Sequence, residues 1–144
     1  MFHPWRPLDR EWKAHPSLKW HVDDLGVTVW LEEWSDSTCQ IAVEIRFDHL
    51  VGQIATDESI HFVSPYFPKE EELQDDGSVD LPWPIWRSST NYRRDLYTDF
   101  ASEIYGSVVS YLFHGSETVL LLDVNDSEPK IRTVGPGERD SGSH

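Results

Sequence analysis

The sequence predicts a mainly β protein of the α+β class, either an antiparallel β-sandwich or one strongly curved sheet, with one amphipathic helix near residues 90–104. Three observations support this class. Apolar and polar residues alternate along two neighbouring segments, two further β-branched segments flank a short turn, and apolar residues at helical spacing stand out in one stretch. Because the strands follow one another in adjacent pairs, a parallel doubly wound sheet is not expected.

The first 24 residues are predicted to form an extended arm. Their prolines prevent one long helix, and the tryptophans between them supply large apolar groups. We expect the arm to pack by these tryptophans on a single β-rich domain over residues 25–134. Residues 135–144, rich in Gly and charge, are expected to be a disordered tail that ends in an affinity-tag remnant.

The clearest strand signal lies in residues 27–32 and 41–48, where every second residue is aliphatic or aromatic. Period two is typical of half-buried strands. The turn-forming residues Ser35–Thr38 join them, which predicts an antiparallel hairpin. Residues 50–55 and 60–63 are expected to extend this hairpin into a meander.

The second half of the chain is predicted to hold the helix and another hairpin. Apolar residues recur every four positions over residues 90–104. Val108–Phe113 and Thr118–Val124 are dense in β-branched residues and should pair, and Val119–Leu122 has the unbroken apolar character of a strand covered on both faces. Residues 131–134 are expected to add one short strand.

The Leu81–Trp86 segment contains two prolines, so it is predicted to be an edge strand or an extended segment. Trp30 and Trp34 alternate with the aliphatic residues of the first hairpin and therefore face away from them. Either the arm or the Leu81–Trp86 segment covers these two rings in a second small core, or they form an aromatic surface for a partner or ligand.

Charge and cysteine content narrow the function classes. The 144 residues include 26 Asp and Glu against 12 Lys and Arg, a net charge of −14. This balance argues against nucleic acid as a ligand and favours a basic partner. Cys39 is the only cysteine, so no intramolecular disulfide can form. With no apolar signal-peptide region and no long apolar run, the predicted location is the cytoplasm, without membrane association.

No metal site, cofactor or catalytic motif is predicted. The seven histidines show no metal-ligand spacing, and we interpret them as ordinary surface residues. Cys39, at the start of an alternating strand, is interpreted as a small buried apolar residue rather than a nucleophile. An enzyme remains an alternative only if a site forms in space, with Asp57, Glu58 and His61 as the candidate groups.

The candidate partner-binding residues lie in two neighbouring segments. These are the acidic loop, residues 69–78, and the Pro-rich segment, Leu81–Trp86. The simpler interpretation of this run of acidic residues is a solvent-exposed loop without a binding role. The functional interpretation is a patch that steers a basic protein, with two tryptophans as anchors. The candidates are Glu70, Glu71, Glu72, Asp75, Asp76, Trp83 and Trp86.

The stretch Val43–Glu58 resembles a pattern in small bacterial β-sandwich proteins of the immunity-protein type. In that pattern a strand ending in Phe-Asp leads to a second strand that closes with Thr-Asp-Glu, here Phe47-Asp48 and Thr56-Asp57-Glu58. The order of later elements up to residue 124 is also similar. The pattern has His where this chain has Ser110, so no functional residue carries over there.

The resemblance implies an immunity or accessory partner in a toxin system. Together with the charge, it predicts a non-enzymatic cytoplasmic protein that binds a basic protein partner, most concretely an immunity-type inhibitor of a cognate toxin. A small-molecule or carbohydrate-binding module that uses exposed aromatic rings is the alternative from another class, and the spatially assembled enzyme is the third.

Overall fold

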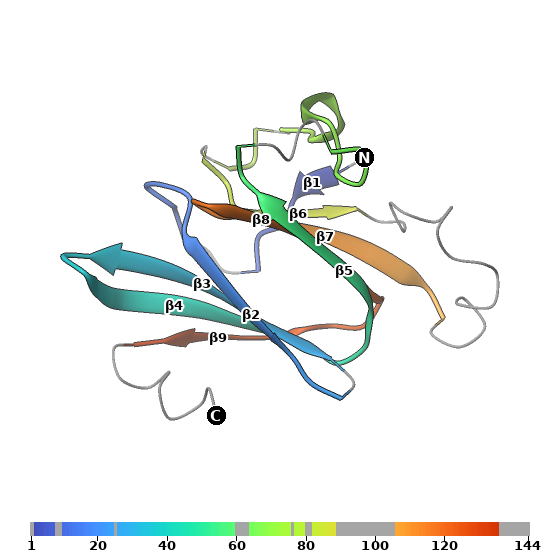
Figure 1. Cartoon of the computed structure of the whole chain (residues 1–144), viewed down its shortest axis with the longest axis horizontal. Coiled ribbons are helices and arrows are strands. Elements are labelled where there is room, and N and C mark those ends of the chain that lie inside the picture. The colour runs from blue at the N-terminus through green and yellow to red at the C-terminus, as the bar shows by residue number, and fades with distance from the viewer. Residues whose placement is uncertain are drawn as a thin grey trace.

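The computed structural model describes residues 2–7, 10–24, 26–59, 64–75, 77–79, 82–88 and 106–135. Within these residues the chain forms two antiparallel β-sheets packed face to face, so the predicted fold class is confirmed (Figure 1). One sheet has five strands in the order β1-β6-β7-β8-β5, and the other has four in the order β2-β3-β4-β9. Their bounds are β1 (Phe2–Pro4), β2 (Ser17–Val22), β3 (Val27–Ser35), β4 (Thr38–Phe47), β5 (Leu50–Asp57), β6 (Ile85–Ser88), β7 (Val108–His114), β8 (Thr118–Asn125) and β9 (Lys130–Val134).

Both predicted hairpins are confirmed. β3 pairs antiparallel with β4, and the turn between them places Asp36 and Ser37 at φ angles of 51° and 64°. Two left-handed residues match the twist of a tight hairpin, and Asp tolerates that conformation. β7 pairs with β8 in the same way. Val119–Leu122 are all fully buried, as the unbroken apolar run predicts.

The core lies between the sheets and is rich in aromatic rings. Phe47 of β4 meets Tyr111 and Phe113 of β7, with ring centroids 4.8 and 6.2 Å apart. Trp5 adds an edge-on contact to Tyr111 at 4.9 Å. Such tilted and edge-on pairs add to the energy of burial itself, so this aromatic cluster holds the two sheets together.

The predicted meander is wrong at β5. β5 does not continue beside β4 but pairs with β8 in the five-stranded sheet. The chain crosses from one sheet to the other at Asp48-His49, where the Asn125 N–H donates to the His49 carbonyl at 3.1 Å. The physical reason is that β8 is buried along Val119–Val124 and needs a neighbour on each side, whereas alternation along β5 specifies a strand without specifying its partner.

The N-terminal arm and the Pro-rich segment also differ from expectation. The arm supplies a strand to each sheet, since β1 pairs with β6 and β2 pairs with β3. Trp12 is buried, and Trp5 and Trp20 pack against the core, as expected. β6 lies between β1 and β7, so it is not an edge strand. Its prolines precede Ile85, so every residue of β6 itself keeps its N–H.

Trp30 and Trp34 have different environments. Trp30 is 7% exposed and its Nε1–H donates to Glu44 Oε1 at 2.9 Å, whereas Trp34 is 48% exposed. The predicted helix over residues 90–104, the predicted strand over residues 60–63 and the tail beyond Gly135 lie outside the described residues. Within the described ranges, no helix has the length and apolar character needed to cross a membrane.

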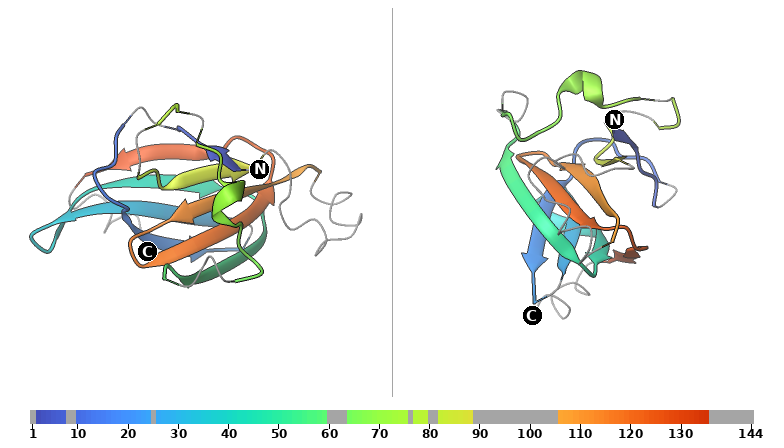
Figure 2. Two further views of the ribbon diagram at one scale, coloured as in Figure 1. Left: turned by 90° about the horizontal axis from the view of Figure 1, so that it is seen from above. Right: turned by 90° about the vertical axis from the view of Figure 1, so that its right-hand side faces the viewer.

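The acidic loop is fixed against the edge of the five-stranded sheet. Phe67 is buried in the core, and the Gln74 N–H donates to the Phe2 carbonyl at 2.7 Å. Leu73 forms a parallel bridge with Phe2. Figure 2 shows the short 3-10 helix η2 (Glu70–Glu72) beside the N-terminal strand in both views. These contacts bring the loop close to the segment that contains Trp83 and Trp86.

Candidate functional site

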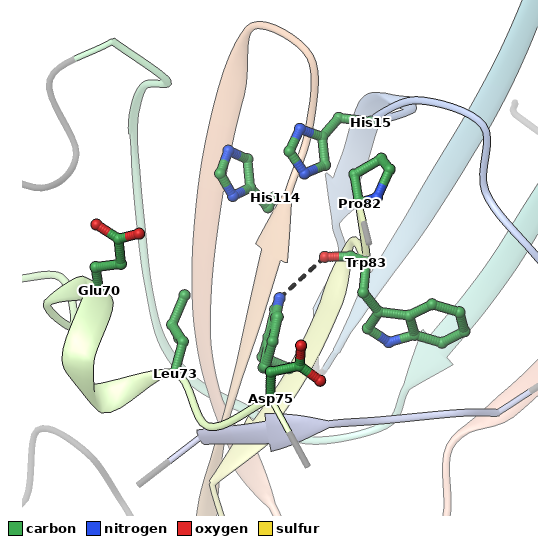
Figure 3. A pocket seen from close by; sticks show the side chains of 8 residues that line it. His15, Glu70, Leu73, Asp75, Pro82, Trp83 and His114 are labelled. Atoms are coloured by element: carbon green, nitrogen blue, oxygen red, sulfur yellow. Dashed lines mark hydrogen bonds between the residues drawn. The ribbon is translucent and has the colours of Figure 1, made fainter. Parts of the chain in front are cut away.

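A pocket of about 540 Å³ lies between the acidic loop and the Pro-rich segment (Figure 3). The loop, the Pro-rich segment, the arm and the end of β7 all contribute to its lining. Its lining residues are His15, Glu70, Leu73, Asp75, Pro82, Trp83, Trp86 and His114. Four of the predicted partner-binding residues therefore meet around one cavity, whose size is typical of a ligand site.

The two tryptophans form the wall of this pocket and do not project from the surface. Trp83 and Trp86 are 4% and 5% exposed. The Trp83 Nε1–H donates to the Trp5 carbonyl and the Trp86 Nε1–H donates to the Trp83 carbonyl, each at 3.0 Å. Most of each ring is already used for packing, so only the part of each indole that lines the pocket is left to contact a partner, and their role as anchors stays a prediction.

The acidic candidates separate into distinct groups. Glu70 and Asp75 line the pocket. Glu71 and Glu72 belong to the same loop but are not among the lining residues, and the Glu72 carboxylate turns back to accept the Lys69 N–H at 2.9 Å. Asp76 lies outside the described residues. The acidic charge relevant to the pocket thus comes from Glu70 and Asp75.

Two histidines close one end of the pocket, side by side in Figure 3. The rings of His15 and His114 stack with centroids 4.0 Å apart and planes 11° from parallel. His114 Nε2 lies 3.7 Å from a Glu58 carboxylate oxygen. The backbone holds the pair in register, since the Ser116 N–H donates to the Pro16 carbonyl at 2.8 Å and the His114 N–H to the Pro84 carbonyl at 2.7 Å.

Sequence reasoning missed this histidine pair. His15 lies in the arm and His114 ends β7, so the two are far apart along the chain. Their contact depends on the arm reaching the β7–β8 turn, which is a long-range feature. Only their residue types were visible in the sequence, and neither position carries a recognisable motif.

Of the three groups named for the enzyme alternative, the structure describes Asp57 and Glu58. Asp57 accepts bonds from the Ser59 hydroxyl at 2.6 Å and the Ser59 N–H at 2.8 Å, and these bonds lower the pKa of the Asp57 carboxyl. A carboxylate held in its ionised form is a poor proton donor. His61 lies outside the described residues. Among the residues that are described, no group of three or more His, Cys, Asp and Glu side chains is placed to hold a metal ion.

The pocket combines an apolar wall with negative charge. The lining combines indole, leucine and proline side chains with the Glu70 and Asp75 carboxylates, which lie to either side of Leu73 in Figure 3. None of the described lining residues is Lys or Arg. A group that carries a positive charge on an apolar body fits both features, since the body contacts the rings while the charge faces the carboxylates.

Comparison of the chain with protein-family models, with curated proteins and with solved structures found no match. The resemblance to immunity-type proteins therefore stays a prediction.

Proposed function

We propose that this chain is a non-enzymatic binding protein for a basic partner protein, and that the pocket between the acidic loop and the Pro-rich segment receives a Lys or Arg side chain of that partner. The observation that carries the proposal is that Glu70 and Asp75 line the same pocket as Trp83 and Trp86. The most concrete form of this function is a cytoplasmic immunity-type inhibitor that masks the basic surface of a cognate toxin.

Two kinds of interaction support binding. The net charge of −14 attracts a basic protein over long range and raises the association rate at low salt. The pocket adds a short-range contact, because a long basic side chain buries its methylene groups against the indoles and places its charge near the carboxylates. In this mechanism the net charge raises the association rate, and the pocket selects partners that present a suitable basic side chain.

Affinity purification from the native host tests this function. The unaltered chain should retain a basic protein that salt releases, because screening weakens charge attraction. The bait Glu70→Lys/Asp75→Lys reverses both pocket carboxylates and should lose that protein. Glu117→Lys/Glu128→Lys is the matched control, since it makes the same change in net charge at two exposed positions outside the pocket lining.

Recovery of the same basic protein by all three baits would mean that net charge alone explains the binding, and the pocket role would be rejected. Recovery of no basic protein by the unaltered chain would reject the proposed function itself.

A further inference from the structure

We infer that a second pocket, at the tip of the β3–β4 hairpin, is a binding site for a neutral polyhydroxylated ligand of the saccharide class. This pocket has a volume of about 420 Å³ and lies between the arm and the hairpin tip. Its lining includes Trp34, Glu33, Ser35, Gln40, Lys13 and Ser17. His15 lines both pockets, but none of these six residues lines the first one, so this inference rests on different side chains from the proposed protein-binding function.

Trp34 provides an open aromatic surface. It is 48% exposed, one of the few large apolar side chains of the described residues with such exposure. An exposed indole offers a flat apolar face on which the C–H face of a sugar ring can stack. Lys19 Nζ lies over one face of the ring, 6.0 Å from its centroid, while about half of the Trp34 side chain stays exposed to solvent.

The hairpin tip holds Trp34 in a defined position. The register shifts between Glu33 and Trp34, so that Gln40 is an extra residue opposite the tryptophan. The Gln40 side-chain amide donates to the Ser35 and Thr38 carbonyls, each at 3.4 Å. A bulge of this kind redirects side chains at the end of a strand pair. Trp34 and Gln40, on the two strands of this bulge, both line the pocket.

The charges around this pocket are balanced within the protein. Glu33 forms an ion pair with Arg10, and the buried Glu32 carboxylate lies 3.8 Å from Lys19 Nζ. The pocket therefore has no large excess of either sign, in contrast to the first pocket, and gives an ionic ligand little electrostatic advantage. A neutral ligand is the better match.

The polar lining supplies both hydrogen-bond donors and acceptors. Lys13 donates, Glu33 accepts, Ser17 and Ser35 can do both, and Gln40 offers its amide oxygen as an acceptor, because its N–H groups already donate to backbone carbonyls. Each sugar hydroxyl also donates and accepts, so a ring with several hydroxyl groups uses such a lining on all sides. A pocket with one apolar face and several mixed polar groups fits a saccharide ring better than it fits a purely apolar or an ionic ligand.

Titration with a fixed panel of sugars tests the inference. The probes are glucose, N-acetylglucosamine, maltose, cellobiose and chitobiose, and the readout is the set of ¹H–¹⁵N chemical shifts, including the indole N–H signals. We expect at least one sugar to bind saturably with a Kd of about 1 mM or tighter and to shift the Trp34 indole signal. Glucosamine and glucuronic acid should bind no more tightly than their neutral counterparts.

Variants locate the binding. Trp34→Ala should weaken the best sugar at least about tenfold, because it removes the stacking surface. Trp34→Phe should retain part of the affinity. Tyr66→Ala is the matched control, since Tyr66 is 51% exposed but lies outside this pocket, and it should leave the affinity unchanged.

The inference is overturned if none of the five sugars gives a saturable shift at a concentration of about twenty times the expected Kd of about 1 mM. Full affinity in a folded Trp34→Ala variant, or shifts confined to the Trp83 and Trp86 signals, also overturns it. The charge-reversal variants of the first pocket leave Trp34 intact, so failure of the protein-binding proposal and failure of this one are distinguishable.

Discussion

Gly115 lies where the β7–β8 turn meets the arm, and we expect Gly115→Ala to lower the stability of the protein. A Cβ atom at this position would lie 2.6 Å from Leu18 Cγ and 2.8 Å from the Thr118 carbonyl oxygen. The Leu18 side chain can shift, but that carbonyl already accepts the Gly115 N–H at 2.9 Å. The backbone therefore cannot move away without lengthening this hydrogen bond, and the new methyl group overpacks the site.

The size of the effect follows from two opposing terms. Overpacking a tight site costs about 1–3 kcal/mol. Alanine restricts the unfolded chain more than glycine and returns about 0.4–1 kcal/mol. Taken at the middle of each range, the net loss is about 1.3 kcal/mol. With a denaturant dependence of about 2 kcal/mol per molar urea, the unfolding midpoint should fall by about 0.5–1 M.

Urea unfolding followed by tryptophan fluorescence measures this midpoint. Ser116→Ala is the control, because Ser116 is exposed and its backbone N–H to the Pro16 carbonyl remains. The reasoning is refuted if Gly115→Ala leaves the midpoint unchanged, or if Ser116→Ala lowers it equally.

Two further predictions concern how the stability of the protein depends on pH. Bonds from Arg132 and Trp30 hold the pKa of Glu44 below 4.5, so this carboxylate stabilises the fold above that pH and loses the effect as the pH falls through the lowered pKa. Glu44→Gln should cost about 0.5–1 kcal/mol in urea unfolding at pH 7 and nothing near pH 2, since Arg132 is largely exposed. Burial raises the pKa of Tyr111 above 10.0, so the neutral phenol stabilises the fold below that pH, and the effect is lost as the pH rises through the raised pKa. The Tyr111→Phe variant should therefore lose less stability than the unaltered protein between about pH 9 and about pH 11. An equal loss in the two proteins would contradict the raised pKa of Tyr111.

Local sequence patterns predicted where the strands lie better than they predicted which strands pair with each other. The β3–β4 and β7–β8 hairpins follow from period two and turn-forming residues, which act over neighbouring positions. The partner of β5 does not follow from such patterns, because β8 lies far along the chain and the choice between sheets depends on the complete core. For the same reason the interior position of β6 was missed.

The candidate site was predicted in part. The run of carboxylates and the nearby tryptophans indicated the region in which Glu70, Asp75, Trp83 and Trp86 line one pocket, and binding of a partner there stays a prediction. The burial of both indoles was not visible, because it depends on Trp5 from the arm accepting the Trp83 N–H. The contact of His15 with His114 likewise requires two distant segments to meet.

The pairing of β5 with β8 has a consequence for synthesis of the chain. β5 ends at Asp57 and β8 begins at Thr118, so β5 emerges from the ribosome roughly 60 residues before its partner, ~3–12 s at typical translation speeds. During that interval its backbone N–H and C=O groups lack their native strand, and such an edge is prone to pair with other chains. The nascent protein therefore depends on rapid completion of its C-terminal hairpin, and slow translation before residue 118 should increase aggregation.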